Sequence, residues 1–512
     1  MAGRVTRDRR DAGEPVHVAT PDGVLRGLRS DGVDVYRGIP YAAPPTGARR
    51  FAAPAAPTPW TGMRNAAATP TRAVQPLAGL LRATRRVTEG VRHGEDCLTV
   101  DVAAPAGAAQ DTAARRPRRA VLVWVHGGAF RTGSGAEYDG APLVRLGDIV
   151  VVTVNYRLGA LGFLDLADAL GLHADDRRFA GNAGVLDVIA ALEWVRDTIA
   201  RFGGDPARVT IAGESAGAGI VTSLLVSPSA RGLFAGVIAQ SGVLNFTTER
   251  EDAADAAREF LVALGAAPDR LDRLHDATPG QVLSAMRRVT ALRPDGLPFR
   301  PWFDGELLPA SHAAARDAPT TAVPLLIGTN RDEHRLFTVL RQDVVPRSRQ
   351  RIALMLVAEA GADRAARILT RYPDDPRGLN DLGTHGVFTM PAVHLADRHS
   401  AVAPVHRYRF DYGTTRLGLG AFHAIDLLFL FDGPAALDRV LLGRPSPERT
   451  ALADRLRRHW VEFVRSGSPG GDWPPYEVPG RETKLFDVTD SVARDPEGDR
   501  RRVWHDAEVP AP

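Results

Sequence analysis

The sequence predicts an α/β fold in which helices cover both faces of a mostly parallel, doubly wound β-sheet. Residues 120–125 and 149–154 are apolar at nearly every position, which is typical of strands that are buried on both faces. Before a third apolar run, at residues 209–212, apolar side chains recur at helical spacing over residues 185–199. Strands that alternate with helices along a chain form a parallel sheet that is covered on both sides.

The expected elements follow one another without an internal repeat or a long linker. Residues 15–62 alternate short β-like segments with turns, which predicts antiparallel strands at the start of the sheet. Residues 64–94 lack clear periodicity and predict a surface loop with a short helix near residues 80–86. Further strands are expected at residues 98–102, 120–125, 149–154, 209–212, 236–239, 323–328 and, as the last central strand, 405–412. Helices are expected at residues 182–202, 249–293 and 346–402, and a helix at residues 449–464 is expected to close the domain.

Length and composition indicate one large globular domain. The chain has 512 residues, of which 44% are hydrophobic and 24% charged, and this balance supports a substantial core. We expect a single domain over residues 15–505. A polar N-terminal tail at residues 1–14 and a C-terminal tail at residues 506–512 are expected to flank it.

The sequence contains no pattern typical of a membrane-bound, secreted or disulfide-linked protein. No apolar run is long enough for a membrane span, and the arginine-rich N-terminal segment is not followed by the apolar stretch of a secretory signal. The single cysteine, Cys97, excludes an intramolecular disulfide and a multi-cysteine metal cluster. We therefore expect a cytoplasmic protein.

The formal charge of +3 and the isoelectric point of about 9.2 do not indicate a nucleic-acid partner. Basic residues are spread along the chain with acidic residues between them, and the arginines of residues 115–119 fall in a predicted loop. No RNA- or DNA-binding motif is present. A solvated surface explains this charge pattern.

The stretch around Ser215 joins a predicted strand to a predicted helix through a glycine-rich turn, GESAG. Glycines on both sides of a serine allow a turn tight enough to expose its hydroxyl above the sheet. The alternative is an ordinary strand-to-helix turn that contains a serine by chance. The strand before it and the helix after it favour Ser215 as the nucleophile of an acyl-transfer enzyme.

Serine-based acyl transfer also needs a base, an acid that orients the base, and hydrogen-bond donors for the oxyanion. The segment HGGAF follows the strand that ends at residue 125. Backbone amides of consecutive glycines can point into a site without interference from side chains. We expect the amides of Gly127, Gly128 and Ala216 to be the oxyanion donors, with an ordinary glycine turn as the alternative.

Two acidic residues and one histidine are placed to complete such a site. Glu333 and Asp332 both follow the strand predicted at residues 323–328, and spacing alone does not decide which of them is the acid. Among the 14 histidines, His423 follows the last predicted core strand in a glycine-containing loop. The chain order is then serine, acid, histidine, which is the order of the α/β-hydrolases.

Ten motifs along the chain support a resemblance to a known family. In order they are YRGIPYA, PPTGARRF, EDCLTVDV, WVHGGAF, VNYRLGALGFL, GNAGVLD, FGGDPARVTIAGESAGA, QSG, VPLLIGTNRDE and AFHAIDLLFLF. Over about residues 15–503 the chain resembles the type-B carboxylesterases, the family of the cholinesterases and para-nitrobenzyl esterases. The resemblance implies an α/β-hydrolase fold with helical cap or side insertions, and a triad of Ser215 as nucleophile, Glu333 rather than Asp332 as acid, and His423 as base. It also implies a small-molecule ester as substrate and neither a metal nor another cofactor.

The resemblance assigns structural roles as well. It implies ion pairs of Arg50 with Glu95 and of Arg157 with Asp187. It also makes His126 a brace for the oxyanion loop rather than a carrier of protons.

Several residues depart from the family pattern. His334 stands where the family has a glycine after the acid, which places a second imidazole near the triad. Asp426 replaces a glutamate three residues after the histidine and shortens a supporting contact. Thr99 replaces a common tyrosine, and Cys97 lacks the partner cysteine of secreted relatives. Residues 64–94 contain no tryptophan, the aromatic that holds choline in cholinesterases, so choline esters are not expected as preferred substrates.

We expect a serine carboxylester hydrolase for esters of small to medium hydrophobic acids or alcohols, acting as a monomer or weak homo-oligomer. An amidase or carbamate hydrolase would use the same residues. A non-catalytic binding module, as some cholinesterase-like adhesion proteins are, would lack a member of the triad, whereas this chain keeps all three. The pocket walls are expected from residues 64–94, residues 244–300 and the segment around Phe388.

Overall fold

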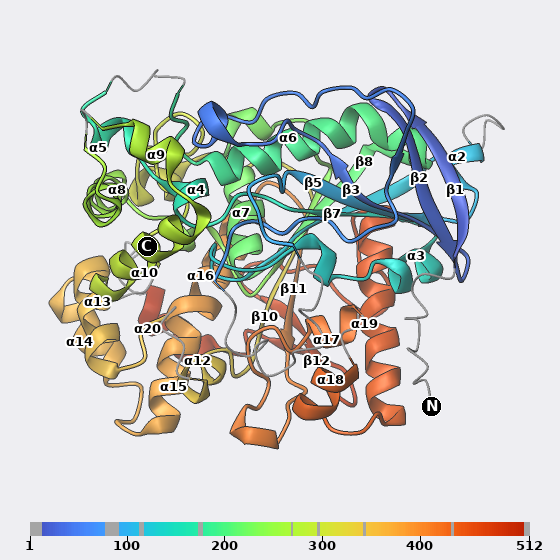
Figure 1. The fold of residues 1–512 in the computed structure, drawn as a ribbon. Helices are drawn as coiled ribbons and strands as arrows, with labels where there is room; N and C mark the ends of the chain where they lie inside the picture. The colour runs from blue at the N-terminus through green and yellow to red at the C-terminus, as the bar shows by residue number, and fades with distance from the viewer. Residues whose placement is uncertain are drawn as a thin grey trace, which may run out of the picture.

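The computed structural model describes residues 13–76, 92–111, 117–172, 178–267, 270–293, 297–340, 345–431 and 435–505. Within these residues, thirteen strands form one sheet that crosses the molecule (Figure 1). The strands are β1 (Glu14–Thr20), β2 (Gly23–Ser30), β3 (Val33–Pro40), β4 (Met63–Asn65), β5 (Thr99–Pro105), β6 (Arg119–Val125), β7 (Val150–Val154), β8 (Gly204–Glu214), β9 (Gly236–Gln240), β10 (Leu325–Asn330), β11 (Val405–Phe410), β12 (Glu482–Phe486) and β13 (Ser491–Arg494).

The sheet is antiparallel at its N-terminal edge and parallel in its centre. Its strands lie in the order β1-β2-β3-β5-β7-β6-β8-β9-β10-β11-β12-β13, and β4 pairs with β2. The pairings from β1 to β7 along this order are antiparallel, whereas every pairing from β7 to β12 is parallel. The antiparallel start and the parallel, doubly wound centre both agree with the prediction from the sequence.

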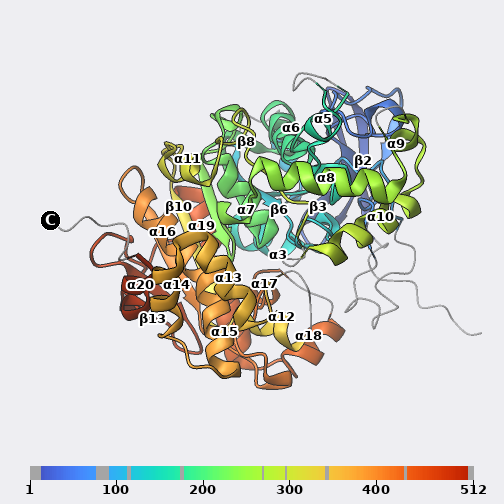
Figure 2. The ribbon, with the colours of Figure 1, turned by 90° about the vertical axis from the view of Figure 1, so that its left-hand side faces the viewer.

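Helices lie on both faces of the sheet and beyond its ends. They are α2 (Ala108–Asp111), α3 (Ala141–Gly147), α4 (Ala160–Phe163), α5 (Leu166–Ala169), α6 (Ala183–Thr198), α7 (Ala216–Leu224), α8 (Arg250–Leu264), α9 (Asp272–Asp276), α10 (Pro279–Leu292), α11 (His312–Asp317), α12 (Arg335–Val339), α13 (Arg349–Ala360), α14 (Ala362–Leu369), α15 (Pro376–Thr384), α16 (Met390–His399), α17 (Leu427–Leu430), α18 (Ala435–Leu441), α19 (Pro447–Ser466) and α20 (Gly498–His505). A π-helical turn, His385–Thr389, joins α15 to α16. Figure 1 shows α6 above the strands and α19 below them, and Figure 2 shows α8 and α10 in a layer separate from α13, α14 and α15.

The side chains of strand β6 pack into two hydrophobic cores, one on each face of the sheet. Val121 and Val123 belong to the hydrophobic core that includes residues of α6 and α7. The alternating residues Leu122 and Trp124 belong to the core on the other face, with residues of α3 and α19. Because successive side chains of a strand point to opposite faces, a strand covered on both sides must be apolar at every position.

The C-terminal edge of the sheet contains two strands that the sequence does not predict. The helix expected to close the domain, α19, is followed by β12, β13 and α20, and β11 is therefore not the last central strand. Strand β12, ETKLF, contains two charged residues, and its Lys484 is buried with its ammonium 2.7 Å from a carboxylate oxygen of Asp472. A short strand with charged positions lacks the continuous apolar run that marks the central strands, so the sequence pattern did not predict it.

Some expectations fall outside the described part of the chain. The helix expected near residues 80–86 lies there, as do residues 506–512 and most of the N-terminal tail. Strand β1 starts at Glu14, one residue before the predicted start of the domain, and the single domain over residues 15–505 stays a prediction. None of the described helices is both long enough and apolar enough to cross a membrane.

Both predicted ion pairs are present. Arg50 Nε lies 2.7 Å from Glu95 Oε2, and Arg157 Nη2 lies 2.7 Å from Asp187 Oδ1. The second pair is buried: Arg157 also donates from Nε and from its backbone amide to Asp187, and from Nη1 to the Ala52 carbonyl. This buried pair therefore joins the loop after β7 to α6 through hydrogen bonds to protein groups.

Removal of the carboxylate from this buried pair is expected to destabilise the fold strongly. In Asp187→Ala the guanidinium of Arg157 stays charged and buried without its partner, which costs about 3–5 kcal/mol in free energy of unfolding. Denaturant unfolding followed by circular dichroism measures the loss. Asp197→Ala is the matched control, because its pair with Arg196 is exposed and contributes less than about 1 kcal/mol. Equal losses in the two variants would contradict the role given to Asp187.

Candidate active site

Ser215 lies at a sharp turn between the end of β8 and the start of α7. Its backbone has φ 54° and ψ −122°, a conformation that is strained in a residue with a side chain. Two glycines make the turn possible: a Cβ on Gly213 would lie 2.5 Å from the carbonyl carbon of Gly217, and one on Gly217 would overlap the Val125 carbonyl oxygen. Ala216, a predicted oxyanion donor, is the first residue of α7, where backbone amides have no partner within the helix.

The segment QSG, residues 240–242, packs behind this turn. The Ser215 amide donates to the Gln240 carbonyl at 2.9 Å, and a Cβ on Gly242 would overlap the Ser215 carbonyl oxygen. The Gln240 side chain donates to Asp426 at 2.7 Å. The QSG motif therefore supports the strained backbone at Ser215, a role that the sequence pattern did not show.

The glycine loop after β6 runs directly beside Ser215. A Cβ on Gly127 would lie 2.7 Å from the Glu214 carbonyl oxygen and 3.2 Å from the Ser215 Cβ, so glycine is required for this close approach. Gly128 has φ 112° and Ala129 has φ 56°, so the chain turns sharply at both residues. Burial raises the pKa of Tyr138, and the Gly127 amide acts on the same hydroxyl as a hydrogen-bond donor. The assignment of the Gly127, Gly128 and Ala216 amides as oxyanion donors stays a prediction.

His126 is buried behind the glycine loop and holds its shape. Its Nδ1 lies 2.8 Å from the Gly127 carbonyl oxygen, and its ring stacks on Tyr156 with 4.5 Å between the centroids. The Tyr156 hydroxyl donates to the His126 carbonyl at 2.8 Å. Burial lowers the pKa of His126 to about 4, so the ring is uncharged at neutral pH. These contacts agree with the bracing role that the family resemblance implies.

His423 and Glu333 are in direct contact. His423 Nδ1 lies 2.7 Å from Glu333 Oε2, and Glu333 Oε1 accepts a hydrogen bond from the Asn330 amide at 2.7 Å. Both side chains are buried. Asp332 makes different contacts, because its carboxylate forms ion pairs with two partly exposed arginines, each at 3.1 Å. Of the two acidic residues, the structure brings Glu333 to the imidazole.

The second imidazole that the sequence places after the acid is engaged elsewhere. His334 Nε2 lies 2.8 Å from the Pro346 carbonyl oxygen, and a Cβ on Gly383 would overlap the His334 ring. Burial lowers the pKa of His334. This ring therefore links the start of α12 to the loop before α13 and packs against α15.

Asp426, the other departure from the family pattern, is fully buried and well supported. Its carboxylate accepts hydrogen bonds from Gln240 at 2.7 Å, Tyr408 at 3.0 Å and Asn330 at 3.3 Å. Burial, together with the nearby Glu333 carboxylate, raises the pKa of Asp426. Its partners place it beneath both the serine turn, through Gln240, and the acid loop, through Asn330.

Glu214 is a member of the site that the sequence analysis missed. It is the last residue of β8, directly before Ser215, and its Oε1 lies 3.2 Å from His423 Nε2. Burial raises the pKa of Glu214. Burial by itself lowers the pKa of His423, but the carboxyl groups of Glu214 and Glu333 outweigh this and raise it. The imidazole thus lies between two carboxyl groups, and Nε2 faces the side chain of the residue directly before Ser215.

Phenylalanines form the apolar surroundings of the His423 ring. The ring centroid of Phe388 lies 4.9 Å and that of Phe337 5.1 Å from the centroid of His423. Phe246 lies 5.9 Å from Phe388, and a Cβ on Gly219 of α7 would lie 3.4 Å from the Phe246 Cβ. Phe388 and Phe246 belong to two of the segments expected to form pocket walls, and the structure places both near the site.

This arrangement supports nucleophilic attack and proton transfer. A strained serine, a histidine bonded to a carboxylate and a glycine loop are the parts that acyl transfer requires. In the part of the chain that the structure describes, no group of three or more His, Cys, Asp or Glu side chains is arranged to hold a metal ion.

Known proteins resemble the chain over nearly its whole length. The model of the Carboxylesterase family matches residues 14–504. The chain is 37% identical to the para-nitrobenzyl esterase of Bacillus subtilis (strain 168), covering 95% of this chain and 97% of that protein. It is 30% identical to the cocaine esterase of Homo sapiens, covering 97% and 92%. A solved structure of a thermophilic PNB esterase has a TM-score of 0.86 at 35% identity and covers 95% of this chain and 99% of its own.

These matches confirm the predicted α/β-hydrolase fold and the resemblance from which it was inferred. Because one family model spans almost all of the sequence, the agreement does not depend on the serine turn alone. The chain belongs to the carboxylesterase family, the type-B carboxylic ester hydrolases.

Proposed function

We propose that this carboxylic ester hydrolase forms an acyl-enzyme on Ser215, with His423 as the base and Glu333 as the acid. The observation that carries the proposal is the orientation of the His423 ring, whose Nδ1 is bonded to Glu333 while Nε2 lies 3.2 Å from Oε1 of Glu214, the residue directly before Ser215. A proton held on Nδ1 leaves the lone pair of Nε2 available for the proton of the serine hydroxyl.

The reaction follows from these positions. Ser215 Oγ attacks the ester carbonyl carbon while its proton passes to His423 Nε2, and Glu333 stabilises the resulting imidazolium. The imidazolium then gives its proton to the departing alcohol. Water attacks the acyl-enzyme with the same proton transfers and releases the carboxylic acid.

Backbone amides receive the negative charge of the tetrahedral intermediate. We assign this role to Gly128 and Ala216, which lie on either side of the serine turn. The third donor that we propose is Gly127 or, if its amide is engaged by Tyr138, Ala129, the next residue of the loop. One such donor contributes about 3 kcal/mol to the lowering of the barrier.

The proposed substrates are esters of small to medium hydrophobic acids or alcohols. The phenylalanines around His423 offer apolar surface to an acyl chain. The test is kcat/KM for p-nitrophenyl esters of increasing acyl length, each with a matched p-nitroanilide. We expect an optimum at short to medium chains and anilide hydrolysis slower by several orders of magnitude. Faster cleavage of the anilides would make the protein an amidase, and hydrolysis of neither series would remove the proposal.

The cellular setting and the assembly belong to the same proposal. A cytoplasmic location is supported by the lone, buried Cys97, which cannot form an intramolecular disulfide. We propose a monomer or weak homo-oligomer that binds no nucleic acid, since the basic residues are interleaved with acidic ones along the chain.

Glu214 provides a pH test of this mechanism. His423 must be uncharged to accept the serine proton, so kcat/KM rises as pH increases through the pKa of His423. The carboxyl group of Glu214 raises that pKa, so Glu214→Gln is expected to lower it and to move the acidic limb of the profile to lower pH by about one pH unit. Glu193→Gln, an exposed change on α6, should leave the profile in place. A shift to higher pH in Glu214→Gln would show that Glu214 does not act on His423 as proposed.

A further inference from the structure

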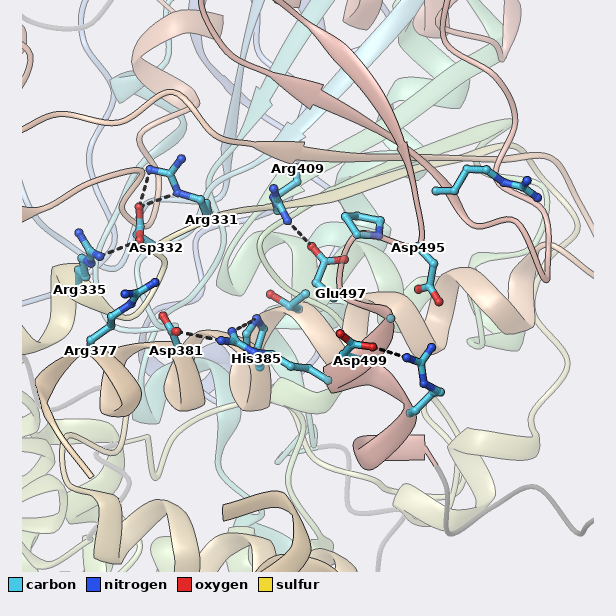
Figure 3. Close-up of a pocket in the computed structure, with 16 residues that line it drawn as sticks. Arg331, Asp332, Arg335, Arg377, Asp381, His385, Arg409, Asp495, Glu497 and Asp499 are labelled. Atoms are coloured by element: carbon cyan, nitrogen blue, oxygen red, sulfur yellow. Dashed lines mark hydrogen bonds and ion pairs between the residues drawn. The ribbon is translucent and has the colours of Figure 1, made fainter. Parts of the chain in front are cut away.

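A charged cavity of about 730 Å³ lies on the outer side of the acid loop. Its walls come from residues 331–335, from α15 and the π-helical turn after it, and from residues 494–502 (Figure 3). Seven arginines and five carboxylates line it. The volume is within the range of small-molecule binding sites, but the lining is far more charged than that of an apolar ester pocket.

Positive charge is concentrated at one end of this cavity. Arg331 and Arg335 share a single carboxylate, that of Asp332, with each guanidinium 3.1 Å from an oxygen. Arg377 projects from α15 toward the same end, and among the described residues it has no hydrogen bond or ion pair through its side chain (Figure 3). Two guanidinium groups therefore share Asp332, and a third lies near Asp381, a carboxylate that is already paired with Arg500 (Figure 3).

The charges at the other end are matched. Arg409 pairs with Asp411 at 2.6 Å and with Glu497 at 2.9 Å, and Glu497 also accepts from the buried Arg407 at 3.0 Å. The arginines at this end are thus occupied by carboxylates of the protein. An incoming anion would find available donors only where Arg331, Arg335 and Arg377 converge.

A histidine in the wall responds to the positive charge of the cavity. Arg500 Nη1 lies 3.3 Å from His385 Nδ1, and Arg500 Nη2 lies 3.2 Å from Asp381. Burial and, next to it, the charge of Arg500 lower the pKa of His385 to about 3. The part of this shift that comes from Arg500 reflects its positive charge beside the ring.

We infer that this cavity binds a small multivalent oxyanion through Arg331, Arg335 and Arg377. Guanidinium groups bind phosphate and carboxylate oxygens with paired hydrogen bonds, and three of them at one end of the cavity suit a ligand with more than one negative charge. The ligand would draw Arg331 and Arg335 away from Asp332, because all of the negative oxygens compete for the same donors.

The bound anion would also act on the active site, a step that rests on the proposed function. Asp332 precedes Glu333, and it exchanges two backbone and side-chain hydrogen bonds with Ala421, two residues before His423, each at 2.9 Å. The cavity wall also contains the residues that flank Phe388 in the π-helical turn, and Phe388 packs on His423. A change in the partners of Asp332 is thus transmitted to both the acid loop and the histidine loop.

Isothermal titration calorimetry with inorganic pyrophosphate, at ionic strength held constant with sodium chloride, tests the binding. Ser215→Ala protein is the background, so that the result does not depend on catalysis. We expect one site per chain, affinity about tenfold weaker in Arg377→Gln, and affinity several-fold stronger in Asp332→Asn, which removes the competing carboxylate. Arg231→Gln, an exposed change before β9, is the control and should match the parent protein.

Two results would overturn the inference. Absence of pyrophosphate binding at millimolar concentration, or equal affinity in Arg377→Gln and Arg231→Gln, would remove the site. For the second step, kcat/KM of the wild-type enzyme is measured against pyrophosphate concentration. The value of kcat/KM should change as pyrophosphate is added, with its midpoint at the dissociation constant measured by calorimetry. An unchanged kcat/KM at saturating pyrophosphate would remove the link to the active site. If the enzyme hydrolysed no ester, the calorimetric result would still stand, so the two proposals fail separately.

Discussion

Replacement of Ser215 by alanine is expected to reduce kcat for p-nitrophenyl ester hydrolysis by roughly 10⁴- to 10⁶-fold. Without the hydroxyl no acyl-enzyme forms, and only the oxyanion donors and substrate binding remain to accelerate attack by water. KM should change little, because Ser215 contributes to the reaction rather than to ground-state binding. The turn should survive, since its shape depends on Gly213, Gly217 and the hydrogen bond to the Gln240 carbonyl.

A serine in the helix that follows Ser215 gives a matched control. Ser223 is buried in α7, and its hydroxyl donates to the Gly219 carbonyl at 2.8 Å. Ser223→Ala also removes one hydroxyl group, without touching the proposed nucleophile, so activity should stay within a few-fold of the parent. A stoichiometric burst of p-nitrophenol, measured by stopped flow, should appear in Ser223→Ala and be absent in Ser215→Ala. A persisting burst in Ser215→Ala would place the nucleophile on another residue.

The centre of the fold was predictable because burial on two faces leaves a strong trace in the sequence. Strands β6 and β7 must be apolar at almost every position, and α6 must place apolar residues at helical spacing to cover them. Strand β12 carries no such trace, because a short strand with a buried lysine satisfied by Asp472 is as polar as a loop. Its place in the sheet depends on pairing with β11, which is distant in sequence.

The parts of the site that depend on local backbone were also predictable. Gly213 and Gly128 are required by close contacts with Gly217 and Thr132, four residues further along the chain, and such a local requirement appears in the sequence as a motif. Glu214 lies inside the same motif, but its role depends on contact with His423, which is more than 200 residues away. The choice between Glu333 and Asp332 is of the same kind, because adjacent residues at a strand end point in different directions and only the tertiary fold fixes which one meets the imidazole.

A comparison of Glu333→Gln with Asp332→Asn is expected to separate these two residues by about three orders of magnitude in kcat. Glu333→Gln should lose roughly 10³- to 10⁴-fold, the cost of neutralising the acid of a comparable triad. The neutral amide no longer stabilises the imidazolium. It can also donate to Nδ1, which favours the tautomer with its proton on Nε2 and blocks transfer from Ser215.

In Asp332→Asn we expect kcat to fall by less than about tenfold, because the Asp332 carboxylate pairs with Arg331 and Arg335 rather than with His423. The asparagine oxygen can still accept the Ala421 amide, so the histidine loop keeps its support. Both kcat values are measured with the same p-nitrophenyl ester, and circular dichroism verifies that both variants are folded. If Asp332→Asn caused the larger loss, the acid would be Asp332 and the 2.7 Å contact between His423 and Glu333 would be structural. The contact geometry argues against that outcome, because His423 Nδ1 lies 2.7 Å from Glu333, whereas the Asp332 carboxylate pairs with Arg331 and Arg335.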